Sequence, residues 1–302
     1  MTIFNRGRTN PELWLELERI RGDRNTDFGA LEGRRWDVVI DCCGYLPQAV
    51  EKSARFLSSA TDLYVFISSI SVYPDLSLPG LSEESDVAAL PEGEPIDEVT
   101  DQNYGALKAL CEAIVERELP GRALVVRPGL VVGPNDHTDR FTYWPVRIAG
   151  GGEVLAPGIP GRLVQFIDVR DLAGWVAVMA EGRRTGIFNA TGPATPLPFG
   201  DLLSECKAVS ASDAAFAWVP DEWLVENEVQ PWVDLPLWLP EEDMTVDCSR
   251  AVGAGLGFRA LADTVRDTLE WHGTRAEGLA AGVGLDRDRE RALLRRFGAE
   301  RG

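Results

Sequence analysis

The sequence is poor in histidine and cysteine. Only His137 and His272 occur among 302 residues, which excludes a three-histidine metal site and disfavours a Ser-His-Asp hydrolase. The five cysteines are odd in number and scattered, apart from the neighbours Cys42 and Cys43, and no Cys-x-x-Cys spacing indicates zinc. We therefore expect reduced cysteines and no bound metal.

Positive charge and long apolar runs are also scarce. The formal net charge is −18 and the isoelectric point lies near 4.6. Because phosphate binding needs a basic surface, nucleic acid and anionic membranes are disfavoured as partners. No apolar run approaches the roughly 18 residues that span a bilayer, and the first residues lack the layout of a signal peptide. We expect a cytoplasmic protein that binds a small-molecule substrate.

Apolar runs of strand length alternate with helix-length segments over the first third of the chain. The pattern predicts strands at 2–4, 18–20, 36–41 and 63–67 and a helix at 47–58. Such alternation is typical of strand-helix-strand units and therefore predicts an α/β fold with a parallel sheet. Ligands of such sheets bind at the carboxyl ends of the strands.

The stretch from Tyr64 to Lys108 carries the residues that suit catalysis best. An apolar run from Tyr64 ends in Ser68 and Ser69, and Tyr104 precedes Lys108 by four residues, which places both on one helix face. A nearby ammonium favours the phenolate and lowers a tyrosine pKa from its usual value of about 10. We predict Tyr104 as general acid/base, Lys108 as its activator, and Ser69, with Ser68 as the fallback, as the group that holds the reacting oxygen.

Several segments, in this order, resemble the extended short-chain dehydrogenase/reductase superfamily in its NAD-dependent epimerase/dehydratase branch. They are 68–73 (Ser-Ser-Ile-Ser-Val-Tyr), 104–108 (Tyr-Gly-Ala-Leu-Lys), 125–134, 165–173 and 255–268. The resemblance covers most of the chain up to about His272. It implies a Rossmann-type doubly wound parallel sheet with a smaller interleaved substrate-binding domain. It also implies oxidoreductase, epimerase or dehydratase chemistry on a carbonyl or alcohol, sugar-derived compounds included.

The resemblance divides the chain into three parts. Residues 1–134 would form the dinucleotide-binding domain, 135–272 a substrate-binding portion with returning sheet elements, and 273–302 a charged helical tail. The family's opening strand and glycine-rich turn, which hold the pyrophosphate at a helix start, have no counterpart, because residues 2–7 match the family's second strand. A misassigned start codon, a truncated chain and a relative that has lost cofactor binding compete as explanations, and we favour the first two.

The resemblance also assigns the cofactor contacts. Its second strand ends here in Asn5-Arg6-Gly7-Arg8, and arginine suits the 2′-phosphate of NADP where an acidic residue would suit NAD. We therefore predict NADP, with NAD as the second choice. Asp23 matches a position near the adenine, Gly44 a turn at the adenine ribose, and Lys108 a contact to the nicotinamide ribose. The predicted cofactor-binding residues are Asn5, Arg6, Arg8, Asp23, Gly44, Ser68, Lys108 and Arg127.

The substrate and the catalytic status stay open at this point. Nucleotide-sugar enzymes of this branch often carry asparagine and tyrosine where this chain has Leu130 and Val132, and leucine cannot donate a hydrogen bond. A less polar substrate is therefore as well supported as a nucleotide sugar, with Arg147 and Arg162 as candidates to hold an anionic group. The alternative is a non-catalytic protein that senses NAD(P) or binds a partner on the same fold. The family's catalytic helix commonly packs in a dimer interface, which makes a homodimer a further expectation.

Overall fold

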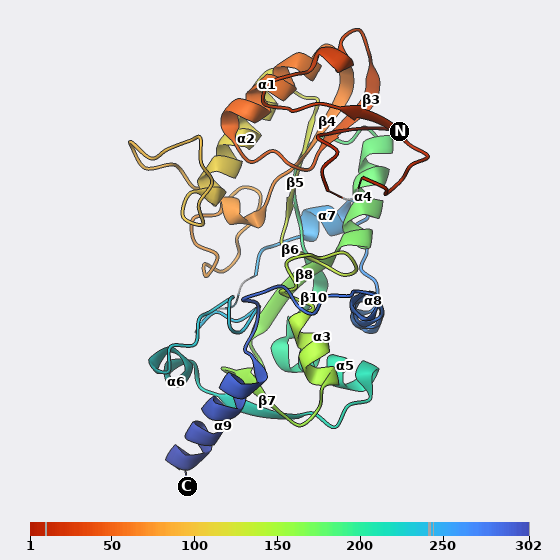
Figure 1. Ribbon diagram of the computed structural model, residues 1–302. Coiled ribbons are helices and arrows are strands. Elements are labelled where there is room, and N and C mark those ends of the chain that lie inside the picture. The colour runs from red at the N-terminus through yellow and green to blue at the C-terminus, as the bar shows by residue number, and fades with distance from the viewer. Residues whose placement is uncertain (10, 241–242, 244, 302) are drawn as a thin grey trace. The chain divides into compact units, whose positions relative to one another are not determined.

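The computed structural model describes residues 1–9, 11–240, 243 and 245–301, and its internal contacts divide the chain into two compact units (Figure 1). The first unit comprises Met1–Asp75, Glu83–Pro128 and Val176–Asn189, and the second Leu76–Ser82, Gly129–Trp175 and Ala190–Gly302. Both units are thus assembled from separate pieces of sequence. The second unit takes the larger share of the chain, where a smaller one was expected.

A four-stranded sheet with the order β3-β4-β5-β9 forms the centre of the first unit. The strands β3 (Trp36–Asp41), β4 (Thr61–Ile67) and β5 (Ala123–Pro128) pair in parallel, and β9 (Gly186–Ala190) completes the sheet. The strand β4 is buried along most of its length, as expected of an apolar run in the middle of a parallel sheet. The predicted α/β class with a parallel sheet is confirmed.

Two helices pack side by side against this sheet (Figure 1). They are α1 (Pro47–Leu57) and α2 (Tyr104–Glu118). Pro47 stands at the start of α1, where its missing N–H costs no helical hydrogen bond. The buried apolar side of both helices contributes to one core cluster with β4 and β5, and each fully buried Val, Leu or Phe side chain in it stabilises the fold by roughly 1.5–3 kcal/mol. The cluster contains Val50, Ala54, Leu57, Tyr64, Phe66, Cys111, Val115, Leu119, Ala123 and Val125.

The strands β1 (Thr2–Asn5) and β2 (Glu18–Arg21) form a separate two-stranded parallel sheet. Among the described residues no strand joins this pair to β3. The absence of the family's first strand was inferred from the sequence alone, and it stays a prediction. A stack of rings links the small sheet to α1. The ring of Phe28, which follows β2, lies 5.9 Å from that of Phe4 in β1 and 5.1 Å from that of Phe56 in α1.

The second unit combines two small sheets with a set of helices. Strand β8 (Leu163–Asp168) pairs in parallel with β6 (Leu130–Val132) and antiparallel with β10 (Gly192–Pro198), while β7 (Glu153–Pro157) pairs in parallel with β11 (Ala215–Val219). The helix α4 (Val169–Glu181) begins in this unit and ends in the first. The other helices are α3 (Tyr143–Ala149), α5 (Phe199–Ser210), α6 (Asp221–Glu226), α7 (Ser249–Gly253), α8 (Leu261–Gly273) and α9 (Arg287–Arg301).

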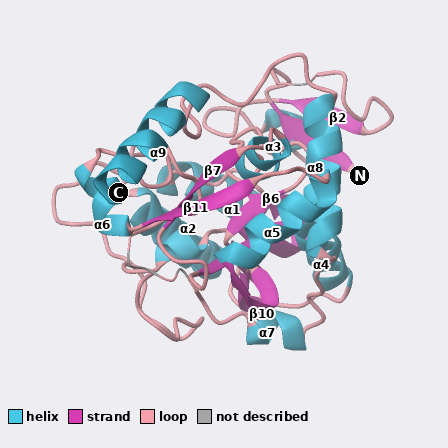
Figure 2. Cartoon of the chain, turned by 90° about the horizontal axis from the view of Figure 1, so that it is seen from below, coloured by secondary structure: helices cyan, strands magenta, loops and turns pink. Residues whose placement is uncertain are grey.

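The charged helix α9 lies against β7 (Figure 2). The side chain of its Glu290 is buried. It accepts a 2.6 Å hydrogen bond from Nε of Arg147 and a 3.0 Å bond from the backbone N–H of Leu155. Leu293 and Leu294 of the same helix are buried as well. The tail is thus fastened to the second unit by a buried ion pair and apolar packing. No helix in the described part of the chain is long and apolar enough to cross a membrane.

Candidate active site

Lys108 is almost fully buried, with 2% of its surface exposed. Its Nζ donates to the backbone carbonyls of Gly44 at 2.8 Å and Ile67 at 2.7 Å, and these carbonyls lie at the carboxyl ends of β3 and β4. The rings of Phe66 and Tyr45 flank the ammonium, at 4.2 and 5.6 Å from Nζ to the ring centroids. Since an ammonium has three N–H donors and two are used, one remains for a ligand.

Burial changes the acidity of Lys108. Removal from water lowers its pKa to about 8 from the ordinary 10.5, although Cys111, Asp41 and Glu112 act in the opposite direction. At neutral pH the ammonium is therefore charged, but close to the pH at which it releases its proton.

Tyr104 begins α2, one helical turn before Lys108, and is half-buried. The centroid of its ring lies 6.5 Å from that of Tyr45. The next residue, Gly105, has to be glycine because a Cβ there would lie 1.9 Å from the carbonyl oxygen of Ser71. The first turn of α2 therefore approaches the short helix η2 (Ile70–Val72) more closely than any side chain permits, which fixes the position of Tyr104.

Ser68 and Ser69 directly follow β4, next to the Ile67 carbonyl that binds Lys108. The Ser69 hydroxyl accepts a 3.1 Å bond from the N–H of Ser71 and donates to the Ser71 hydroxyl at 3.0 Å, so it caps η2. Ser68 is buried, and its hydroxyl has no hydrogen-bond partner among the described residues. A buried hydroxyl without a partner costs about 1–3 kcal/mol, which a ligand would relieve.

Gly44 stands in a turn that a buried carboxylate holds in place. Asp41 accepts a bidentate pair of bonds from Arg24 at 2.6 and 2.7 Å, a 2.8 Å bond from the Tyr64 hydroxyl and a 3.1 Å bond from the N–H of Cys43. Burial alone would raise the pKa of Asp41, but the bonds and charge of Arg24 outweigh it, and the pKa is lowered. Arg24 and Asp41 were not predicted, yet they fix the carbonyl that binds Lys108.

No side chain fits at Gly44 itself. A Cβ there would lie 2.4 Å from the Phe66 ring and 2.8 Å from a methyl of Val50. The sequence analysis singled out this glycine only through the family resemblance. The packing around the turn gives a physical reason why this chain has glycine at position 44.

Four predicted cofactor residues gather at the carboxyl ends of β1 and β2. The Asn5 side chain accepts a 2.9 Å bond from the N–H of Gly7, which has a positive φ of 64° that suits glycine. Asp23 accepts a backbone N–H bond within its own turn, which lowers its pKa, and the charges of Arg6 and Arg8 act in the same direction. Both arginines are exposed, so their guanidinium groups are accessible to an anion.

Arg127 has a different environment from the other predicted cofactor residues. Its buried guanidinium donates to Glu112 at 2.7 and 3.0 Å and to the hydroxyl of Tyr73 at 3.0 Å. That hydroxyl donates in turn to Asn189 at 2.8 Å. These contacts bind β5, α2 and β9 together, and a role of Arg127 in cofactor binding stays a prediction.

The two arginines considered for an anionic substrate are held by carboxylates of the second unit. Arg147 is paired with Glu290 at 2.6 Å and Arg162 with Asp221 at 2.5 Å. An anion would have to displace a buried or nearly buried carboxylate in each case. The interpretation of these arginines as substrate anchors gains no support.

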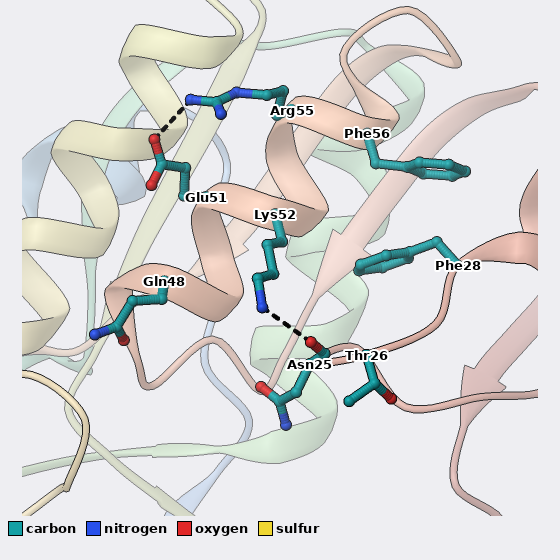
Figure 3. Close-up of a pocket in the computed structure, with 8 residues that line it drawn as sticks. All are labelled: Asn25, Thr26, Phe28, Gln48, Glu51, Lys52, Arg55 and Phe56. Atoms are coloured by element: carbon teal, nitrogen blue, oxygen red, sulfur yellow. Dashed lines mark hydrogen bonds and ion pairs between the residues drawn. The ribbon is translucent and has the colours of Figure 1, made fainter.

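A cavity of about 620 Å³ opens beside α1 in the first unit, and Figure 3 shows its lining. The stacked rings of Phe28 and Phe56 form one wall, and Nζ of Lys52 donates to the carbonyl of Asn25 at 3.0 Å. The Asn25 side chain donates to Asp23 at 3.0 Å, which ties the cavity to a predicted cofactor residue. The lining residues are Asn25, Thr26, Phe28, Gln48, Glu51, Lys52, Arg55 and Phe56, and none is a predicted catalytic residue.

Within the residues that the structure describes, no group of three or more His, Cys, Asp or Glu side chains is arranged to hold a metal ion.

No protein-family model matches the sequence, and neither does any curated protein. Solved structures do match. The UDP-glucuronic acid 4-epimerase from Bacillus cereus in complex with NAD superposes with a TM-score of 0.58 at 16% identity, covering 89% of each chain. The chain shares its fold. The WbmG enzyme of Bordetella bronchiseptica in complex with NAD gives a TM-score of 0.64 at 16% identity, covering 90% of this chain and 85% of that one.

The dTDP-glucose 4,6-dehydratase from Bacillus anthracis in complex with NAD gives a TM-score of 0.57 at 10% identity, covering 87% and 82%. These likenesses confirm the Rossmann-type α/β fold that the family resemblance predicted. At such identities they concern the fold, and the roles of single residues have to be argued from the site.

Proposed function

We propose that this chain is a nicotinamide-dependent enzyme of the extended short-chain dehydrogenase/reductase superfamily, acting on a small carbonyl or alcohol compound. The observation that carries the proposal is the Lys108 ammonium, which is buried at the carboxyl ends of two parallel strands, one helical turn from Tyr104. Burying a charge costs free energy unless it is paired and hydrogen-bonded, and Lys108 has only carbonyl and ring partners among the described residues. Such costly buried charges are found preferentially at functional sites.

The roles follow from the side chains present. A bound nicotinamide cofactor would supply or accept the hydride. Tyr104 passes a proton to or from the reacting oxygen, and the charge of Lys108 stabilises the phenolate that results. The third N–H of Lys108 suits a ribose hydroxyl. The hydroxyl of Ser69, or the unpartnered one of Ser68, holds the reacting oxygen.

The test of this assignment is a set of single-atom changes. Tyr104→Phe removes the proton-transferring oxygen and is expected to lower turnover by at least about 100-fold, while cofactor affinity stays within about twofold. NADPH or NADH fluorescence measures the affinity, and absorbance of the reduced cofactor measures turnover. Ser69→Ala and Ser68→Ala, compared in the same assay, decide which hydroxyl holds the substrate. Full activity in Tyr104→Phe would rule the assignment out.

The choice between the two nicotinamide cofactors rests on the exposed arginines after β1. The three solved structures named above contain NAD and lend no support to NADP. We keep NADP as the prediction because Arg6 and Arg8 lie within electrostatic reach of Asp23 at the strand ends. If they bind the 2′-phosphate, an Arg6→Gln, Arg8→Gln variant should bind NADPH about 10-fold more weakly and NADH unchanged. Tighter binding of NADH than NADPH by the unaltered chain would contradict this choice.

The cavity beside α1 is the proposed place for the adenine end of the cofactor. It adjoins the Asp23 turn through Asn25, it lies near the carboxyl ends of β2 and β3, and it offers apolar rings together with polar groups, as ligand pockets do. Gln48→Trp, which fills the cavity from its exposed rim, is expected to weaken cofactor binding at least about 10-fold without loss of stability.

A second candidate function is a binding protein without catalysis on the same fold. The separation of β1–β2 from the four-stranded sheet favours it, because a dinucleotide site of this kind spans both. Titration with NADPH and NADH separates the candidates. Binding together with loss of turnover in Tyr104→Phe supports the enzyme, and binding without any turnover supports the sensor.

A further inference from the structure

Tyr45 lies at the candidate active site although nothing in the sequence patterns assigned it there. It follows Gly44 in the turn between β3 and α1, and 47% of its surface is exposed. Its ring centroid is 6.5 Å from that of Tyr104, with 39° between the ring planes, and 5.6 Å from Nζ of Lys108. Tyr104, proposed to move the proton, and Lys108, proposed to stabilise its phenolate, thus share an aromatic neighbour in Tyr45.

The surroundings of Lys108 show what this ring does. The carbonyls of Gly44 and Ile67 and the ring of Phe66 contact the ammonium, and Phe66 is fully buried. Tyr45 is the exposed one of the two flanking rings. Of the two rings that flank the ammonium, the ring of Tyr45 is thus the one that stands at the protein surface.

We propose that Tyr45 is a positioning residue of this site, whose ring covers the Lys108 ammonium and keeps water from it. The proposal rests on the proposed function in so far as Lys108 is taken to act with Tyr104. It extends that function by assigning a residue outside the Ser-Tyr-Lys set.

The ring affects the pKa of Lys108 in two opposite ways. It attracts the ammonium, which raises the pKa, and it excludes water, which lowers the pKa. The attraction between an ammonium and a ring reaches out to about 6 Å, so at 5.6 Å it is worth no more than roughly 0.5–1 kcal/mol. Keeping water from a buried charge costs several kcal/mol. Loss of the ring should therefore raise the pKa of Lys108, because the gain in hydration exceeds the loss of attraction.

The other groups that act on Lys108 remain in place when Tyr45 is changed. They are Cys111 and Glu112 on its own helix, Asp41 and Cys42 at the end of β3, and Arg24 in the loop after β2. A change in the titration of Lys108 upon substitution of Tyr45 alone is thus caused by the ring. Tyr45→Phe keeps the ring and removes only the hydroxyl.

The chain contains only three lysines, Lys52, Lys108 and Lys207, so NMR of ¹³C-labelled lysine gives three side-chain signals. Lys52→Arg and Lys207→Arg identify the signal of Lys108. In the unaltered chain Lys108 should titrate near 8. Tyr45→Ala should raise this value by about one pH unit or more, while Tyr45→Phe and the exposed-site control Val178→Ala should leave it within a few tenths.

An unchanged or lower value in Tyr45→Ala would overturn the proposal, and so would an equal rise in Tyr45→Phe. Circular dichroism and thermal unfolding establish that each variant is folded. If the alanine variant does not fold, Tyr45→Val, which leaves part of the cover, should give a smaller rise in the same direction. The measurement needs neither cofactor nor substrate, so its failure is distinct from failure of the Tyr104→Phe turnover test.

Discussion

A buried ammonium makes stability depend on pH in a direction unusual for lysine. The pKa of Lys108 is lowered by burial to about 8, from 10.5 in water, and this difference corresponds to roughly 3 kcal/mol. Between these two values the unfolded chain binds more protons than the folded one at this residue. Stability therefore rises with pH through this window, and below it the full cost of the charge is present.

Lys108→Met removes this contribution. The unfolding free energy of the unaltered chain, minus that of the variant, should increase by roughly 3 kcal/mol from pH 7 to pH 10.5. Urea unfolding at several pH values measures both free energies. The pH-dependent contributions of tyrosines and cysteines cancel in the difference, because the two chains have the same tyrosines and cysteines. A difference that stays level or falls with pH would show that the charge of Lys108 is not buried at a cost.

The spacing that nominates Tyr104 and Lys108 is visible in the sequence, but the contacts that surround Lys108 are not. The spacing of Tyr104 and Lys108 is a local signal, because residues four apart share a helix face. The contacts of Lys108 with the Gly44 carbonyl and the Tyr45 ring span more than sixty positions of sequence, and the Arg24–Asp41 pair joins a turn to the end of β3. Turn residues have no periodicity, so no pattern in the sequence brings them together.

At the level of elements, the contact between α2 and η2 sets the place of the proposed acid/base. A helix that carries Tyr104 and Lys108 follows from their spacing, whereas η2 was not predicted. How closely the two elements approach depends on the missing side chain of Gly105. The helix α2 begins at Tyr104, because the buried Asn103 side chain bonds to the backbone of the preceding residues Thr100 and Glu98. The start of this helix is thus set by local hydrogen bonds of the Asn103 side chain, which helix propensity does not describe.

Gly105→Ala is expected to disrupt this contact. The added Cβ would meet the Ser71 carbonyl at 1.9 Å, so α2 must shift, at a cost of about 1–3 kcal/mol. A displacement of Tyr104 by about 1 Å should lower turnover on the order of 100-fold. The assay is urea unfolding together with the turnover assay.

The matched control for this change is Gly174→Ala in α4, where an added Cβ meets nothing within 4 Å. There the exchange should stabilise the helix by about 0.5–1 kcal/mol and leave activity unchanged. Equal effects of the two substitutions would refute the proposed close approach at Gly105.

At the scale of the whole molecule, the family resemblance implied returning sheet elements within 135–272, and β9 joins the first sheet from that range. The exact division of chain pieces between the units, and the burial within the tail, were not predicted. The tail at 273–302 was recognised as helical and charged, but its composition conceals the buried Glu290. From its sequence alone a charged helix is predicted to be exposed to solvent. Its burial is predictable only when the buried partner of one of its charges is known.

Glu290→Ala should destabilise the second unit by about 3–5 kcal/mol, because it leaves the Arg147 guanidinium buried without its carboxylate. Arg291→Ala on the same helix removes an exposed pair with Asp288 and should cost less than about 1 kcal/mol. Thermal and urea unfolding measure both. Similar losses in the two variants would mean that α9 is not anchored through Glu290.

Because Lys108 is buried and the chain has only two other lysines, the modification of Lys108 can report how often the site opens. An amine-acylating reagent reaches exposed Lys52 and half-buried Lys207 directly, but reaches the buried Lys108 only when the structure around it opens. Mass spectrometry gives the acylation rate of each lysine. The rate at Lys108, divided by the rates at Lys52 and Lys207, thus measures how often the site opens. A ligand that closes over Tyr45 would slow that rate alone, so substrates can be sought by protection of a single amine before any turnover is known.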